Sequence, residues 1–146
     1  MKLIAHRGNT QGRKKHLENH PNYITSAINQ GFDVEVDAWI TDTLYLGHDK
    51  PQYHCPISFL SKYSDKLWIH CKNLKALETL NGIRGLNIFW HQEDDFTLTS
   101  KGFIWTYPEK EVSNKSVLVI KDATKYNPVS IFDGEKCYGL CSDTVI

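Results

Sequence analysis

The chain has 146 residues, of which 40% are hydrophobic and 23% are charged, as in an ordinary globular domain. This length predicts a single domain over residues 1–146. The formal net charge of +0 gives no overall field that would gather nucleic acid or anionic membrane, so any phosphate binding must be local. The first residues turn polar too early for a signal peptide, and no apolar stretch approaches the ~20 residues of a membrane span. We therefore expect a cytoplasmic protein with neither a membrane span nor a nucleic-acid partner.

Short apolar runs separated by polar stretches predict strands at residues 3–5, 34–36, 44–46, 67–69, 88–90, 103–105, 117–120 and 138–140. Helices are expected at residues 22–30, 57–63 and 73–80, and the later strands lie too close together for further full helices. Strands that alternate with helices indicate an α/β fold around a mainly parallel sheet. A complete TIM barrel takes ~250 residues. We therefore expect a pared-down TIM-like (β/α) barrel that lacks helices in its C-terminal half.

Polar side chains interrupt the strand expected at residues 34–36. Successive side chains of a strand alternate between faces, so Glu35 and Asp37 share one face while Val34 and Val36 share the other. Two neighbouring carboxylates repel each other unless a cation joins them or one keeps a proton. Short strands of α/β folds are usually buried on both faces, which favours a metal site over a solvated, acidic strand face.

A second polar strand face follows, where His70 and Lys72 lie opposite Ile69 and Cys71. Two such strands in a short α/β chain indicate a polar site at one end of the sheet, where α/β folds place their chemistry. Two further histidines come directly after expected strands. His6 follows residues 3–5, and His48 follows residues 44–46.

The order of these motifs resembles the N-terminal signature of the glycerophosphodiester phosphodiesterases, in the phospholipase C-like phosphodiesterase superfamily. The similar segments are Ala5-His6-Arg7-Gly8, Glu18-Asn19, Glu35-Val36-Asp37 and Gly47-His48-Asp49, within roughly the first 50 residues. The related sphingomyelinase D enzymes share the histidine-arginine, acid-x-acid and histidine-aspartate elements. Residues 68–72 are similar to the family's next barrel strand. The chain is unusually short for this family.

The resemblance implies a metal-dependent phosphodiesterase that acts on a small glycerophosphodiester-like substrate. His6 and His48 would form the acid/base pair, and Arg7 and Lys72 would hold the phosphoryl oxygens. Glu35 and Asp37 would ligate the metal. The resemblance also implies attack by the substrate's own neighbouring hydroxyl, which gives a cyclic phosphate. Histidine suits proton transfer because it titrates near neutrality.

The chain departs from the family pattern at two positions. His70 stands where the family has its third metal-ligating acid, and Thr43 replaces a glycine after Asp42. Mg²⁺ or Ca²⁺ is the metal that the resemblance implies. With an imidazole among the ligands, Mn²⁺, Zn²⁺ or Fe²⁺ competes better. The alternative is that His70 is not a ligand and the metal site is weakened.

Other interpretations remain open at the level of sequence. One is a catalytically idle barrel that binds a phosphate-bearing ligand or a protein partner, and another is a metal-dependent hydrolase of different bonds. Cys137 and Cys141 form no Cys-x-x-Cys pair, so buried, reduced thiols are favoured over zinc ligands. His91 either lines the mouth of the site or lies on an ordinary surface. Nothing in the sequence indicates the oligomeric state.

Overall fold

The computed structural model describes residues 1–127 and 137–146. Its helices are α1 (Pro21–Asn29), α2 (Ile57–Lys62), α3 (Leu74–Asn81) and the 3-10 helix η1 (Ala123–Lys125). Its strands are β1 (Lys2–His6), β2 (Asp33–Ile40), β3 (Leu44–Leu46), β4 (Tyr53–His54), β5 (Leu67–Cys71), β6 (Ile88–Phe89), β7 (Phe96–Leu98), β8 (Ile104–Thr106), β9 (Ser116–Val119) and β10 (Gly139–Ser142). All strands and helices expected from the sequence are confirmed, with bounds within about two residues except that β2 runs on to Ile40, four residues past its expected end. The short strands β4 and β7 were not expected.

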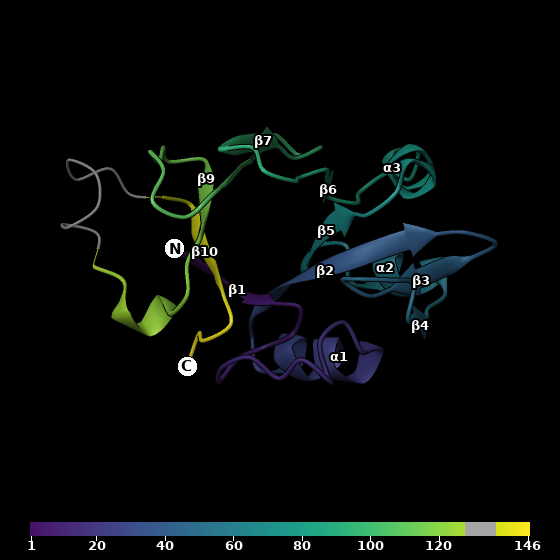
Figure 1. Ribbon diagram of the computed structural model, residues 1–146, viewed down its shortest axis with the longest axis horizontal. Coiled ribbons are helices and arrows are strands. Elements are labelled where there is room, and N and C mark those ends of the chain that lie inside the picture. The colour runs from purple at the N-terminus through teal and green to yellow at the C-terminus, as the bar shows by residue number, and fades with distance from the viewer. Residues whose placement is uncertain (128–136) are drawn as a thin grey trace.

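One mixed sheet contains all ten strands. Its central part is parallel, with the spatial order β6, β5, β2, β1, β10, β9 and β8. The antiparallel strand β7 extends the edge beyond β8, while β3 and β4 form an antiparallel extension on the last residues of β2. β1 therefore lies in the middle of the parallel run, next to β10 from the far end of the chain (Figure 1).

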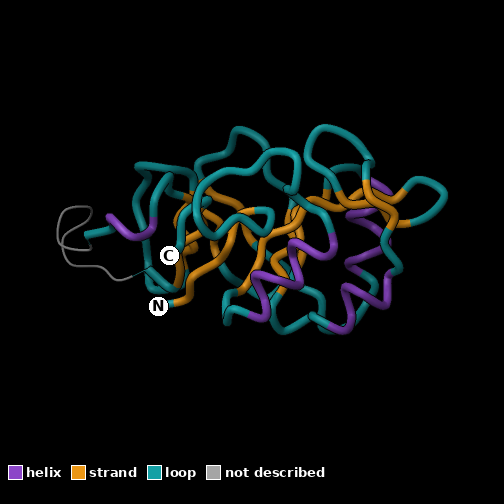
Figure 2. Tube along the Cα trace, turned by 90° about the horizontal axis from the view of Figure 1, so that it is seen from below, coloured by secondary structure: helices purple, strands orange, loops and turns teal. Residues whose placement is uncertain are grey.

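The expected TIM-like (β/α) barrel is wrong. The sheet is a curled, mixed half-barrel with few helices, and antiparallel strands extend it where a barrel would alternate parallel strands with helices. The helices α1 and α3 contact β2, and α3 also contacts β5 and β6. Between β8, β9 and β10, the described residues form only loops and η1. Figure 2 shows both chain ends on the side of the molecule away from α1, α2 and α3.

The outer face of the sheet is apolar because every second side chain of β2 and β5 faces the helices. Val34, Val36 and Ile69 are fully buried there, together with Ile24 of α1 and Leu80 of α3. The first turn of α3 is tied to the end of β2 by one side chain. Asn73 Oδ1 accepts from the Ala76 N–H at 3.0 Å, and Asn73 Nδ2 donates to the Ile40 carbonyl at 2.8 Å.

The inner face of the sheet holds a second, aromatic core. Ile4, Trp68, Phe89 and Trp105 pack together with Val117 and Cys141. The rings of Phe89 in β6 and Trp105 in β8 stack with centroids 4.5 Å apart, so side chains from the two ends of the parallel run meet. Ser100 also ties the strand edges, because its N–H donates to the Ile88 carbonyl at 2.8 Å. The curl therefore encloses an interior at the level of these rings.

Asp33 occupies the same inner face at the start of β2, and all its charge is compensated. Lys2 and Lys66 lie 3.2 and 3.5 Å from its Oδ1 atom, and the Trp68 indole donates to Oδ2 at 3.1 Å. The polar groups at this end of the interior thus hold the fold together. Among the residues that the structure describes, none of the helices has the length and apolar character that crossing a membrane requires.

Candidate functional site

A cavity of about 330 Å³ opens at the carboxyl ends of the inner strands. Its lining residues come from β1, β2, β5, β8 and β9 and from the loops that follow the strands: His6, Arg7, Glu35, His48, His70, Lys72, His91, Gln92, Trp105, Tyr107, Pro108 and Val119. Six of the seven residues that the sequence predicted for the site are in this list. The seventh, Asp37, is fully buried and contacts Arg7, His70 and Lys72. The structure therefore brings all seven together.

Glu35, Asp37 and His70 converge as the alternation of side chains predicted. β2 and β5 pair in parallel with Asp37 opposite His70, so the two inner faces place these groups side by side. His70 Nδ1 lies 3.1 Å from Asp37 Oδ1 and 3.8 Å from Glu35 Oε1. One potential ligand atom from each residue lies within 4.8 Å of the other two. This spacing is compact enough for one cation to contact all three.

Unpaired atoms in this group test whether it fits a metal. Glu35 Oε2 and Asp37 Oδ1 are buried and accept no hydrogen bond within the described part of the chain. Buried carboxylate oxygens are costly unless they have a partner. His70 Nδ1 lies 3.1 Å from Asp37 Oδ1, but this oxygen is left without a hydrogen bond among the described residues. The donors therefore fit a divalent cation.

The ring of His70 is held in the orientation that a ligand needs. Its Nε2 donates to the backbone carbonyl of His91 at 2.8 Å, because a carbonyl oxygen can only accept. Nδ1 is thereby directed at the two carboxylates. Metal-ligating histidines usually donate their second ring N–H to a carbonyl or carboxylate in this way. Phe89 stacks on the ring with centroids 5.1 Å apart and fixes its plane.

The two carboxyl groups have opposite electrostatic environments. Burial and the neighbouring charge of Asp37 raise the pKa of Glu35. Burial alone would also raise the pKa of Asp37. His70, Arg7 and Asn19 outweigh that effect and lower the pKa of Asp37 to about 2. Of the two carboxyl groups, Glu35 is therefore the one that takes up a proton first as the pH falls.

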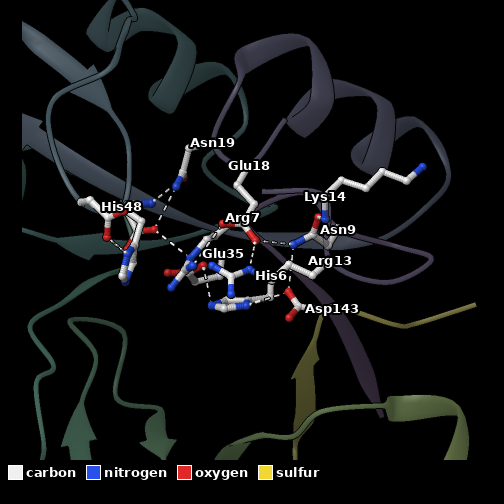
Figure 3. Close-up of polar contacts among 12 residues, drawn as sticks. His6, Arg7, Asn9, Arg13, Lys14, Glu18, Asn19, Glu35, His48 and Asp143 are labelled. Carbon is white, nitrogen blue, oxygen red and sulfur yellow. Dashed lines mark hydrogen bonds and ion pairs between the residues drawn. The ribbon is translucent and has the colours of Figure 1, made fainter. Parts of the chain in front are cut away.

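His6 is paired with a carboxylate that the sequence analysis did not assign to the site. Its Nδ1 lies 2.9 Å from Asp143 Oδ1, and its Nε2 lies 3.8 Å from Glu35 Oε2 (Figure 3). Burial alone would lower the pKa of His6, but Asp143 and Glu35 outweigh burial and raise it. The contact with Asp143 places the proton on Nδ1, so Nε2 is the nitrogen available to accept a proton in the cavity.

A buried polar network supports this pair and was also missed. Asn9 donates to Asp143 Oδ1 at 2.8 Å and to Glu18 Oε1 at 3.1 Å. Glu18 in turn binds Arg7 at 3.2 Å and Arg13 at 3.0 Å. Asp143 lies three residues beyond the last expected strand, at residues 138–140, and directly after β10 as the structure has it. Asn9 and Glu18 lie in the loop after β1; Glu18 belongs to the Glu18-Asn19 segment of the resemblance but had been given no role, and Asn9 had no signal.

Arg7 is clamped between acids. Its Nε lies 3.1 Å from Asp37 Oδ2, and its Nη1 lies 3.2 Å from Glu18. The backbone of Arg7 is left-handed, with φ of 55°, which a non-glycine residue rarely adopts. Backbone bonds to Glu35 and Asn19 hold this conformation. Nη2 makes neither of these contacts, and Arg7 lines the cavity.

His48 lies at the more open side of the cavity, with 40% of its side chain exposed. Its Nδ1 contacts Asp49 Oδ1 at 2.7 Å. The turn before it requires glycine, because a Cβ on Gly47 would lie 2.1 Å from the Lys50 carbonyl oxygen. The Trp39 indole donates to the Gly47 carbonyl at 2.7 Å and fixes this turn. The contact with Asp49 uses Nδ1, so Nε2 is the ring nitrogen of His48 that does not contact Asp49.

Lys72 and His91 complete the wall on the side of β5 and β6. Lys72 Nζ lies 4.0 Å from Asp37 Oδ1 and carries positive charge into the cavity. The His91 ring lies 5.3 Å from the Tyr107 ring and 6.4 Å from the His70 ring, measured between centroids. Burial, with His70 and Lys72 nearby, lowers the pKa of His91. Of the two roles open for His91, lining the mouth of the site is the one that the structure confirms.

The cysteines lie apart from this cavity and are buried, free thiols. Burial raises the pKa of Cys55 to about 11 and that of Cys71 to about 12. Within residues 1–127 and 137–146, the one cluster spaced to hold a metal is Glu35, Asp37 and His70. A zinc site built on Cys137 and Cys141 is therefore not formed.

Comparison of the chain with protein-family models, with curated proteins and with solved structures gave no match. The resemblance to the glycerophosphodiester phosphodiesterases thus rests on the motifs alone.

Proposed function

We propose that this chain cleaves a small glycerophosphodiester-like substrate, with a divalent metal at Glu35, Asp37 and His70 and proton transfer by His6 and His48. One observation carries the proposal. The Nε2 atom of His6, polarised through Nδ1 by Asp143, faces the same cavity as the prospective metal ligands, 3.8 Å from Glu35 Oε2. A base and a cation site that share one cavity suit attack on a phosphodiester.

The donor set supports a divalent cation of intermediate softness. Two carboxylates alone would suit Mg²⁺ or Ca²⁺. The imidazole of His70 is a softer ligand, so Mn²⁺, Zn²⁺ or Fe²⁺ would compete better with them for this site. When bound, such a cation withdraws charge from the phosphoryl oxygens and so favours the transition state. Arg7 and Lys72, on either side of Asp37, would hold the same oxygens by charge-assisted hydrogen bonds.

His6 and His48 would move the two protons of the reaction. His6 Nε2 takes the proton of the substrate's neighbouring hydroxyl, whose oxygen then bonds to phosphorus. The bond from phosphorus to the leaving oxygen breaks, and His48 supplies the proton to that oxygen. The product is a cyclic phosphate and a free alcohol. Asp143 stabilises the imidazolium that forms on His6, because its carboxylate already contacts Nδ1 at 2.9 Å.

The direct test is turnover of glycerophosphodiesters, which carry the neighbouring hydroxyl that the reaction needs, with Mg²⁺, Ca²⁺, Mn²⁺ and Zn²⁺ in turn. His6→Ala and His48→Ala should each lower kcat by about 10²–10⁴-fold. His54→Ala is the matched control, because His54 is exposed on β4 and does not line the cavity. If no metal supports turnover but the chain still binds phosphate, the proposed enzyme would be wrong and a phosphate-binding protein would be the better interpretation.

A further inference from the structure

His91 occupies a position across the interior from His6. In the parallel run β1 is the middle strand, while β6 and β8 are its two ends. The curl brings side chains from these ends together, as the stacked rings of Phe89 and Trp105 show. The residues just after β6 and β8 meet in the same way, with the rings of His91 and Tyr107 5.3 Å apart. Both residues line the cavity that His6 enters from β1.

The two ring nitrogens of His91 differ in their surroundings. Nδ1 is buried and has no hydrogen-bond partner among residues 1–127 and 137–146. Burying an N–H group without a partner is costly, so the ring proton is better placed on Nε2. Nε2 is not one of the buried, unpaired atoms, and the residue lines the cavity. His91 therefore presents an N–H donor to whatever occupies the cavity.

We propose that His91 is a substrate-binding residue that donates its Nε2–H to a phosphoryl oxygen, on the side of the cavity opposite His6. This inference rests on the proposed function, because it assigns a role within the same site. The chemistry it recognises is an anionic phosphodiester or phosphate oxygen. His91 contributes a hydrogen bond and transfers no proton, which distinguishes it from His6 and His48.

The backbone and the side chain of His91 have separate tasks. Its carbonyl accepts the Nε2–H of His70 and so fixes a prospective metal ligand. A substitution of the side chain keeps that carbonyl. Metal binding should therefore survive in His91 variants, whereas contact with the phosphoryl oxygen should not. This separation makes the proposal testable independently of the metal site.

The expected loss of activity in His91→Ala is taken from hydrogen-bond donors in enclosed enzyme active sites. A fixed donor aimed at an oxygen that gains charge can contribute about 10²–10³-fold to kcat. Lys72 lines the same wall and carries a full charge, so part of the loss would be compensated. We expect His91→Ala to lower kcat/KM by about 10²-fold.

The decisive comparison is between His91→Ala and His91→Gln, with His54→Ala as the control, on a glycerophosphodiester that carries the neighbouring hydroxyl. The glutamine amide can donate a hydrogen bond but cannot transfer a proton at neutral pH. His91→Gln should retain most of the activity that His91→Ala loses. Equal losses in the two variants would overturn the role as a hydrogen-bond donor. Activity like that of wild type in His91→Ala would overturn any contact with substrate.

A second measurement separates this inference from the proposed function. Calorimetric titration with inorganic phosphate, in the presence of Mg²⁺, should show weaker binding to His91→Ala than to wild type or His91→Gln. Mg²⁺ affinity should be the same in all three proteins. If the wild type turns over no phosphodiester, the proposed enzymatic function is wrong. The phosphate titration still decides whether His91 binds phosphate. Unchanged phosphate affinity in His91→Ala would overturn it.

Discussion

His6 and Asp143 are 137 residues apart in the chain, yet His6 Nδ1 and Asp143 Oδ1 lie 2.9 Å apart. Parallel pairing of β1 with β10 produces this contact, because it aligns the last residues of the two strands. Asn9 donates to the same carboxylate oxygen at 2.8 Å and holds it in place. The imidazole is thereby fixed in one tautomer, with Nε2 toward the prospective metal ligands.

Asp143→Asn should lower kcat by about 10²–10⁴-fold, because the amide neither stabilises an imidazolium nor fixes the tautomer. The pKa of His6 should fall in this variant, since Asp143 is one of the groups that raise it. Histidine titration by NMR measures that shift. Asp95→Asn is a suitable control, as Asp95 is 58% exposed and pairs only with Lys110 among the ion pairs of the described residues. An unshifted His6 titration would contradict the pairing.

Glu35→Ala should abolish tight binding of Mn²⁺ and Mg²⁺ without unfolding the protein, because the carboxylate lacks a partner for one buried oxygen. Asp33→Asn is the matched control on the same strand face. Its partners are Lys2, Lys66 and Trp68, so this variant should be less stable to heat but bind metal as wild type does. Calorimetry and thermal melts measure the two effects. Equal metal affinity in Glu35→Ala and wild type would rule out the site.

Metal affinity should fall as the pH is lowered. Burial and Asp37 raise the pKa of Glu35, so the metal must displace a proton from this carboxyl at a pH where an ordinary glutamate is already ionised. The pKa of Asp37 is about 2, and this group adds no pH dependence above that range. Titrations between about pH 5 and 8 should therefore show affinity rising with pH. The Glu35→Gln variant should lose the part of this slope that Glu35 contributes.

His70→Glu should shift the metal preference toward Mg²⁺ and Ca²⁺. Three carboxylates form a harder donor set than two carboxylates and an imidazole. The measurement is the ratio of Mn²⁺ to Mg²⁺ affinity in the variant and the wild type. His20→Glu controls for added negative charge, because His20 caps α1 and does not line the cavity. An unchanged ratio would mean that His70 is not a ligand.

Alternation along single strands made the prospective metal ligands predictable from the sequence. Glu35 and Asp37 lie on one face of β2, and His70 lies on the same face of the neighbouring strand β5. Asp143 and Asn9 were not predictable in the same way, because they reach the site through the pairing of β1 with β10. Contacts between distant parts of the chain leave no local periodicity.

The strands were predictable from apolar runs, but the architecture built from them was not. The alternation of strands and helices along the chain predicted a barrel. The chain instead uses β3 and β4 as an antiparallel extension of β2, and β7 as an antiparallel edge next to β8. β4 has two residues and β7 has three, too few for a periodic pattern. Their pairing depends on neighbours that only the folded sheet supplies.

The proposed binding of a cation by Glu35 and Asp37 would also link the folding equilibrium to metal supply. Two buried carboxylates close together repel each other, so without a cation the folded chain either carries this repulsion or takes up a proton on Glu35. A cation that binds the folded state alone would stabilise it by about 2.7 kcal/mol at a concentration of 100 times Kd. The fraction of unfolded chain would then fall about a hundredfold. In a cell, the abundance of such a chain would follow the concentration of its metal.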